Sequence, residues 1–123
     1  MVRFVMFQQV LKECVTKTEG AIAGVLMGFD GIAVDQYVGA EEEVGVESVG
    51  MEYSVVLSQI KQAAQMLGIG PAREVAIKAE HMTAVVRMLS DEYFVALALK
   101  PEGNVGKARY LLRVGAPRLA AGL

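Results

Sequence analysis

The residue types that carry most enzyme chemistry are sparse in this chain. Among its 123 residues there is one histidine, His81, and one cysteine, Cys14. Nucleophilic catalysis needs a nucleophile beside a base, and His81 falls in a predicted turn where no such arrangement has local support. We interpret His81 as a surface turn residue and Cys14, on the apolar side of a predicted helix, as a buried thiol. The sequence therefore predicts no catalytic residue, and we expect a protein that is not an enzyme.

A glycine-rich segment at residues 103–107, GNVGK, could be mistaken for a phosphate-binding loop. The Walker pattern GxxxxGK[ST] places four residues between its glycines, whereas two separate Gly103 from Gly106 here, and Ala108 follows Lys107. Asn104 instead suits the N-cap of a helix, because its side chain can accept a hydrogen bond from the first turn. We interpret the segment as a helix start.

An acidic run, Glu41, Glu42 and Glu43, is the one group of neighbouring side chains that could hold a metal ion. It lacks the ligand spacing of a calcium loop, so we interpret it as a solvated loop whose role stays open. The sequence predicts no metal and no cofactor.

Composition excludes further classes of function. The formal net charge is −2 with Lys and Arg scattered, which disfavours nucleic acid as a partner. A lone cysteine cannot form an internal disulfide, and the first apolar run (Phe4 to Phe7) is too short for a signal peptide or a membrane span. We expect a cytoplasmic protein without membrane insertion. Apolar residues make up 54% of the chain, and excess apolar surface usually serves a partner.

Hydrophobic spacing predicts eight elements in a single domain of residues 1–123. The first two strands are joined through Asp30 and Gly31, where Gly31 can take a positive φ. Gly68 is the predicted C-cap of the long middle helix, and Pro117 is expected to kink the last helix or loosen its final turn. The predicted elements are a helix at 3–17, strands at 21–27 and 32–37, a helix at 47–67, strands at 73–79, 82–89 and 93–99, and a helix from 105.

The apolar faces of these elements predict one α+β fold. Strands 21–27 and 93–99 are apolar on both faces and should be central, whereas strand 73–79 alternates and should lie at an edge. This predicts a five-stranded antiparallel sheet in the order 2-1-5-4-3, with element order αββαβββα. The first and last helices cover one face of the sheet, and the long middle helix covers the other.

The middle helix has two apolar surfaces. Its main stripe, centred on Val56 and Ile60, is predicted to face the sheet. A second patch needs a second surface, and another copy of the chain is the simplest source, together with the edge strand. The predicted dimer interface consists of Met51, Val55, Met66, Val75 and Ile77.

The polar face of the middle helix has two interpretations. It is either an ordinary solvated face or a platform for a partner, because its small uncharged groups permit close approach of another backbone. The candidate partner-binding residues are Ser54, Ser58, Lys61 and Gln65, with Gln62 at the margin.

Two stretches connect this chain to a known family: LMGFDGIAV in the first hairpin and FVALALKPEGNVGKARYLLR leading into the last helix. With the element order, they resemble the Roadblock/dynein light chain family, and most of all its bacterial single-domain, MglB-like members, over about residues 5–120. The resemblance implies a homodimer in which two middle helices lie side by side and two third strands pair into a ten-stranded sheet. It also implies that the exposed side of the helix pair binds small Ras-like GTPases.

These observations lead to one expected function and two alternatives. We expect a homodimer that binds a small Ras-like GTPase and modulates its nucleotide cycle, in a GTPase-activating or scaffold role. The alternatives are a structural adaptor that bridges larger proteins, as dynein light chains do, and a small-ligand sensor, for which the sequence marks no pocket.

An arginine finger supplied to the GTPase is one catalytic role to consider. Arg73, Arg87 and Arg109 are candidates on position alone. The middle helix, which should face the GTPase, contains Lys61 and no arginine. We therefore expect any stimulation of hydrolysis to come from repositioning the GTPase's own residues.

Overall fold

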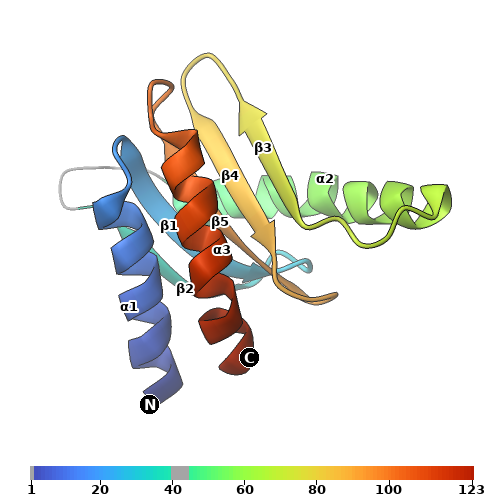
Figure 1. The fold of residues 1–123 in the computed structure, drawn as a ribbon, viewed down its shortest axis with the longest axis horizontal. Coiled ribbons are helices and arrows are strands. Elements are labelled where there is room, and N and C mark those ends of the chain that lie inside the picture. Colours follow the sequence, from blue (N-terminus) through green and yellow to red (C-terminus); the bar gives the residue numbers. More distant parts are fainter. Residues whose placement is uncertain (1, 40–44) are drawn as a thin grey trace.

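The computed structural model describes residues 2–39 and 45–123 (Figure 1). The acidic run at 41–43 lies outside these residues. Within them the predicted order αββαβββα is confirmed, with boundaries that differ from the predicted ones by a residue or two. The elements are α1 (Val2–Lys17), β1 (Ala21–Gly28), β2 (Ala33–Val38), α2 (Val46–Leu67), β3 (Glu74–Lys78), β4 (Thr83–Met88), β5 (Tyr93–Leu99) and α3 (Val105–Ala121).

The five strands form one antiparallel sheet in the predicted order β2-β1-β5-β4-β3. β1 and β5 pair along most of their length, from Ala21 opposite Leu99 to Gly28 opposite Tyr93. Both central strands are almost wholly buried, because helices cover both of their faces. Among the described residues β3 pairs only with β4, which leaves the outer edge of β3 without a paired strand.

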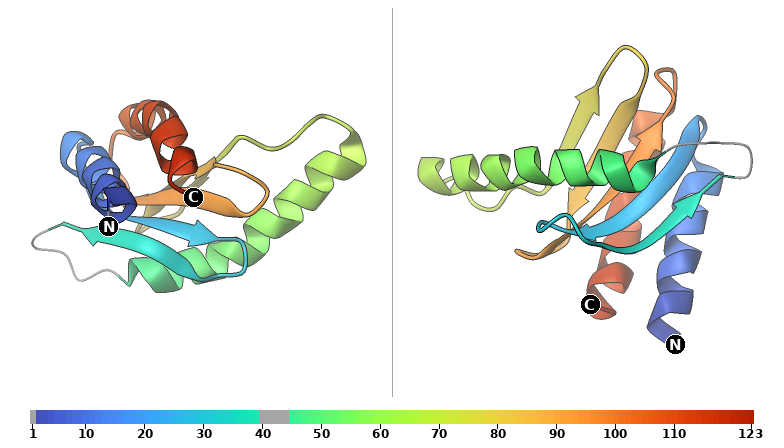
Figure 2. Two further views of the ribbon diagram at one scale, coloured as in Figure 1. Left: turned by 90° about the horizontal axis from the view of Figure 1, so that it is seen from below. Right: turned by 180° about the vertical axis from the view of Figure 1, so that it is seen from behind.

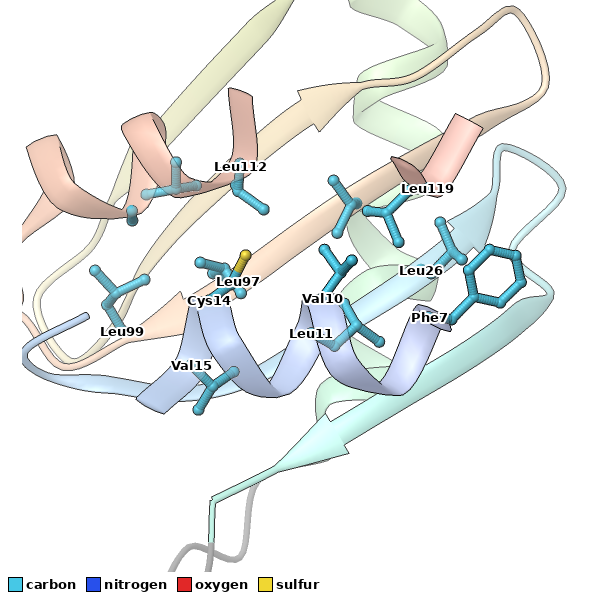
Figure 3. Close-up of a cluster of buried hydrophobic side chains, with 13 residues drawn as sticks. Phe7, Val10, Leu11, Cys14, Val15, Leu26, Leu97, Leu99, Leu112 and Leu119 are labelled. Carbon is cyan, nitrogen blue, oxygen red and sulfur yellow. The ribbon is translucent and has the colours of Figure 1, made fainter. Parts of the chain in front are cut away.

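Helices α1 and α3 lie side by side on one face of the sheet, and α2 crosses the other face (Figure 2). The core under α1 and α3 is built from large apolar side chains of both helices and the central strands (Figure 3). Gly24 in β1 leaves room for the Leu97 side chain of β5, since a Cβ there would lie 2.9 Å from Leu97 Cδ2. Cys14 is buried in this core, and that burial raises the pKa of its thiol to about 11.

Three predicted turn and cap residues are confirmed. Gly31 has φ +84° in the turn between β1 and β2, where Asp30 Oδ1 accepts a hydrogen bond from the Ile32 N–H. Gly68 ends α2 in the left-handed conformation with φ +65°. Asn104 caps α3, because its side-chain oxygen accepts a hydrogen bond from the Lys107 N–H. Residues 103–107 therefore serve as a helix start.

The long helix α2 extends well past the edge of the sheet (Figure 1). Its 22 residues span about 33 Å at roughly 1.5 Å per residue. The five strands are about 19 Å wide at roughly 4.8 Å between neighbours. The first half of α2 packs on β1 and β2, and its C-terminal half projects beyond β3 (Figure 2).

The predicted orientation of α2 about its axis is wrong in one respect. Val56, expected to face the sheet, is 43% exposed, and the fully buried position is its neighbour Leu57. The buried residues of α2 are mostly small, and at Gly50 the helix comes close to β1, where a Cβ would lie 2.9 Å from Met27 Cε. This sheet-facing row consists of Val46, Gly50, Ser54, Leu57 and Ala64.

Candidate functional site

The residues with reactive side chains are far apart and have structural roles. His81 is exposed in the turn between β3 and β4, where its ring lies 3.7 Å from the equally exposed Glu80 carboxylate. Cys14 is inaccessible in the core. In residues 2–39 and 45–123, no three His, Cys, Asp or Glu side chains gather as metal ligands. The candidate site is a surface, and α2 provides most of it.

One side of α2 is apolar and uncovered. Residues at helical spacing along this side go from half-buried near the sheet to exposed at the projecting end, where Leu67 is 71% exposed. Just after the helix, Ile69 is 74% exposed. We call this side the lateral row; it consists of Val49, Val56, Ile60, Ala63 and Leu67.

A second exposed row lies on the side of α2 away from the sheet. It contains the three methionine and valine side chains predicted to contact a second copy, and Met66 among them is 87% exposed. Helical spacing separates this row from the lateral row, with polar Glu52 and Gln59 between them. We call it the outer row; it consists of Met51, Val55, Gln62 and Met66.

The polar residues predicted to bind a partner are brought together, with one exception. Ser58, Lys61, Gln62 and Gln65 line one side of a hollow of about 960 Å³. Its other side is formed by residues 70–73 and by the β4–β5 turn. Of these opposing residues, only Arg73 was a candidate from the sequence, as a possible finger. We call this space the α2 hollow.

Ser54 is the exception. It was predicted to point outward, but it belongs to the sheet-facing row and is 4% exposed. Its hydroxyl donates to the Met51 carbonyl at 2.6 Å, and its own carbonyl accepts from the Ser58 hydroxyl at 2.9 Å. A direct contact between Ser54 and a partner is therefore excluded in this conformation.

Lys61 is the one basic residue of α2, and it is held in place. Its Nζ donates to the Asp91 carbonyl at 2.5 Å and lies 3.8 Å from the centre of the Phe29 ring. A cation over an aromatic face is attracted by the negative electrostatic potential above the neutral ring. These contacts connect α2 to the β1–β2 turn and the β4–β5 turn at one end of the sheet.

The free edge of the sheet lies beside the lateral row. Val75 of β3 packs against the core under α2, and Ile77, two residues on, faces the same side. Both are half-buried. These two apolar side chains therefore lie at the edge of the core, where they are only partly covered.

Of the three arginines considered as fingers, only Arg73 borders the α2 hollow. Arg87 and Arg109 both contact the Glu74 carboxylate on the face of the sheet covered by α1 and α3. Arg73 precedes β3 and lines hollows on both sides. None of the three belongs to α2.

No helix in the described part of the chain combines the length and apolar character that a membrane span requires.

The chain is similar to several solved structures. No protein-family model and no curated sequence matches the chain. Among solved structures, MglC from Myxococcus xanthus is 41% identical, with 96% of this chain and 99% of that chain covered and a TM-score of 0.71. A structure described as MglB with tetrameric arrangement is 18% identical, with 99% and 90% covered and a TM-score of 0.87.

A Roadblock/LC7 domain from Streptomyces avermitilis is 14% identical, with 93% of this chain and 94% of that domain covered and a TM-score of 0.80. The two structures of lower identity share the fold, and MglC shares sequence along nearly the whole chain. The chain belongs to the Roadblock/LC7 family, in the group that contains MglB and MglC.

Proposed function

We propose that this protein is a homodimer that binds a small Ras-like GTPase and modulates its nucleotide cycle. The observation that carries the proposal is the uncovered lateral row of α2 next to the open edge of β3. Contiguous exposed apolar surface of this kind marks sites of protein–protein interaction. The choice of a GTPase as the partner rests on the family resemblance.

A second copy of the chain fits the lateral row and the β3 edge together. Two β3 strands paired about a two-fold axis join the sheets into ten strands and satisfy the free backbone groups of both edges. The half of α2 that projects past β3 then lies over the sheet of the other copy. Pairing of this extent has the size of an obligate interface, roughly 2,000 Å² or more.

The outer row and the α2 hollow stay open in such a dimer, and we assign the GTPase to them. They combine exposed apolar side chains, Met51, Val55 and Met66, with the polar side chains of Gln62 and Gln65. A mixture of apolar contacts and a polar rim is typical of interfaces that form and dissociate. A partner without two-fold symmetry covers both copies of this surface at once, so we expect one GTPase per dimer.

The contacts of Lys61 favour action by binding over action by a catalytic side chain. α2 carries no arginine, and the amine of Lys61 is engaged by the Asp91 carbonyl and the Phe29 ring. A finger must reach the phosphates of the bound nucleotide. Lys61 is already engaged, and Arg73, at the rim of the α2 hollow, is the one arginine of the three candidates near the assigned surface. The contacts of Lys61 also support the second candidate, an adaptor that binds without changing hydrolysis.

Titration calorimetry with a purified Ras-like GTPase of the same organism tests the proposal. The GTPase is loaded with GDP in one experiment and with a non-hydrolysable GTP analogue in another. We expect binding of one GTPase per dimer, with a preference for one nucleotide state. Absence of binding in both states contradicts the proposed partner.

Single-turnover hydrolysis and nucleotide release, measured with and without this protein, separate the two candidates. A regulator changes at least one of these rates, whereas an adaptor binds and changes neither.

A further inference from the structure

A second hollow, of about 430 Å³, lies between β3, β4 and α3. It opens on the face of the sheet opposite α2, because Glu74 and Arg87 alternate with side chains that face α2. The distinguishing feature of this space, which we call the arginine hollow, is the four guanidinium groups that line it: Arg73, Arg87, Arg109 and Arg113.

The arginine hollow carries a large excess of positive charge. Glu74 is the one acid among the described residues that line it, so four guanidinium groups and one carboxylate leave an excess of three positive charges. The chain as a whole has a net charge of −2, so this excess is local. The arginines, Arg109 first, hold the pKa of the Glu74 carboxyl below its usual range.

Glu74 is shared between two of the arginines. Arg109 Nε donates to Glu74 Oε1 at 2.9 Å, its Nη2 contacts the same oxygen, and Arg87 Nη1 lies 3.6 Å from Oε2. One carboxylate cannot satisfy the donors of two guanidinium groups, each of which has five N–H bonds. Glu74 thus acts as an internal counter-ion that only partly neutralises the site.

Neither of the other two arginines forms an ion pair with a carboxylate in residues 2–39 and 45–123, although the charge of Arg113 also helps to lower the pKa of Glu74. Arg113 stacks near the Tyr110 ring, with its guanidinium carbon 5.7 Å from the ring centre. The backbone carbonyl of Arg73 accepts a hydrogen bond from the Met88 N–H, but its guanidinium group makes no hydrogen bond or ion pair with any described residue. Their donors are available to a ligand in the hollow.

We propose that the arginine hollow binds a phosphate group. The planar forks of guanidinium groups match the oxygens of phosphate in pairs, and several such groups around one space favour a multiply charged anion. Gly106 in the first turn of α3 lines the hollow without a side chain, so the anion can approach the positive end of that helix. The volume is that of a small-ligand site, which favours a compact anion over an acidic protein segment.

Pyrophosphate is the probe, because it carries the proposed chemistry without a base, sugar or lipid. Titration calorimetry of the wild-type protein is compared with Arg73→Gln and Arg113→Gln, which remove arginines that no carboxylate of the described chain holds. Each loss of a charge-assisted contact should weaken binding about tenfold. The matched control is Arg118→Gln, in the last turn of the same helix and outside the hollow, which should bind as wild type does.

Glu74→Gln gives a result that a merely structural role does not predict. Removing the internal counter-ion should tighten pyrophosphate binding, while the arginine variants weaken it. Leu67 belongs to α2, across the sheet from the hollow and outside its lining, so Leu67→Lys should leave pyrophosphate binding unchanged. Circular dichroism of every variant checks that the fold is kept.

Three outcomes overturn the proposal: no binding of pyrophosphate by the folded wild type at millimolar concentration, an equal loss in Arg118→Gln, or binding of a hexaglutamate peptide in place of pyrophosphate. Sedimentation with phosphatidylglycerol vesicles identifies the source of the phosphate. Vesicle binding that depends on Arg113 supports a lipid headgroup, and pyrophosphate binding without vesicle binding supports a free anion.

Discussion

The hydroxyl of Ser54 lies 3.5 Å from the position that a Cβ on Gly31 would occupy. The middle of α2 therefore rests directly on the turn between β1 and β2. Gly31 holds that turn with φ +84°, a conformation that side chains rarely adopt. The small side chain of Ser54 fits this close approach between α2 and the turn.

Gly31→Val is expected to destabilise the protein by about 1–3 kcal/mol, because a β-branched residue is strained at this φ. Urea unfolding followed by circular dichroism measures the loss. Gly106→Ala is the control: it lies within α3, and a Cβ there would make only an ordinary contact with Asn104 Oδ1 at 3.6 Å. It should be neutral or stabilising by about 0.5–1 kcal/mol. Equal stability of Gly31→Val and the wild type would show that the turn tolerates another conformation.

Leu67→Lys is expected to convert the dimer to a monomer, because it places a charge in the lateral row at the proposed contact between two α2 helices. The neighbouring change Met66→Lys, in the outer row, should leave the dimer intact. Multi-angle light scattering should give twice the chain mass of 13.2 kDa for the wild type and for Met66→Lys, and the chain mass itself for Leu67→Lys.

The reverse result has a clear meaning. If Met66→Lys separates the copies and Leu67→Lys does not, the dimer uses the outer row, as the sequence predicted. A wild-type protein that is monomeric at micromolar concentration contradicts both versions.

Cys14 is expected to make stability fall as the pH rises above about 8.5, the ordinary pKa of a thiol. Burial raises the pKa of Cys14 to about 11 in the folded protein, so between these values the unfolded chain loses the thiol proton and the folded chain keeps it. Urea unfolding at pH 8 and pH 10 should show a larger loss for the wild type than for Cys14→Ala. Comparison with the variant cancels the contribution of other titrating groups, and equal losses would contradict a buried, protonated thiol.

The sheet order and the helix faces could be predicted because the two central strands are apolar on both faces and β3 is not. The rotation of α2 about its axis could not. Its strongest apolar stripe includes Val56, but the helix comes close to β1 at small residues such as Gly50. A pattern of apolar residues does not show where a small residue allows two elements to approach. The length of α2 could have predicted the projecting end, since a helix longer than the sheet is wide must leave apolar residues uncovered.

Part of the arginine hollow could also be predicted. A turn at residues 80–81 sets the hairpin register that places Glu74 opposite Arg87, as observed. The approach of Arg109 from α3 depends on how that helix packs on the sheet, which no local pattern specifies. Considering each arginine singly, as a possible finger, missed the cluster that they form.

Gln65→Arg is expected to weaken GTPase binding at least about tenfold, because a charge without a partner is costly inside an interface. Gln65 is exposed and lines the α2 hollow, where the proposed partner covers it. The change should alter folding stability by no more than about 0.5 kcal/mol, as is usual for surface substitutions. Titration calorimetry against the GTPase measures the effect on binding, and circular dichroism confirms the fold.

Gln9→Arg is the matched control for this last experiment. It makes the same chemical change at an exposed position of α1, on the opposite face of the sheet, and should bind the GTPase as the wild type does. Comparing the two separates a local clash from the general effect of one more positive charge on association with the GTPase. If Gln65→Arg and Gln9→Arg bind equally well, the α2 hollow is not the GTPase site, and the partner must use another surface of the dimer.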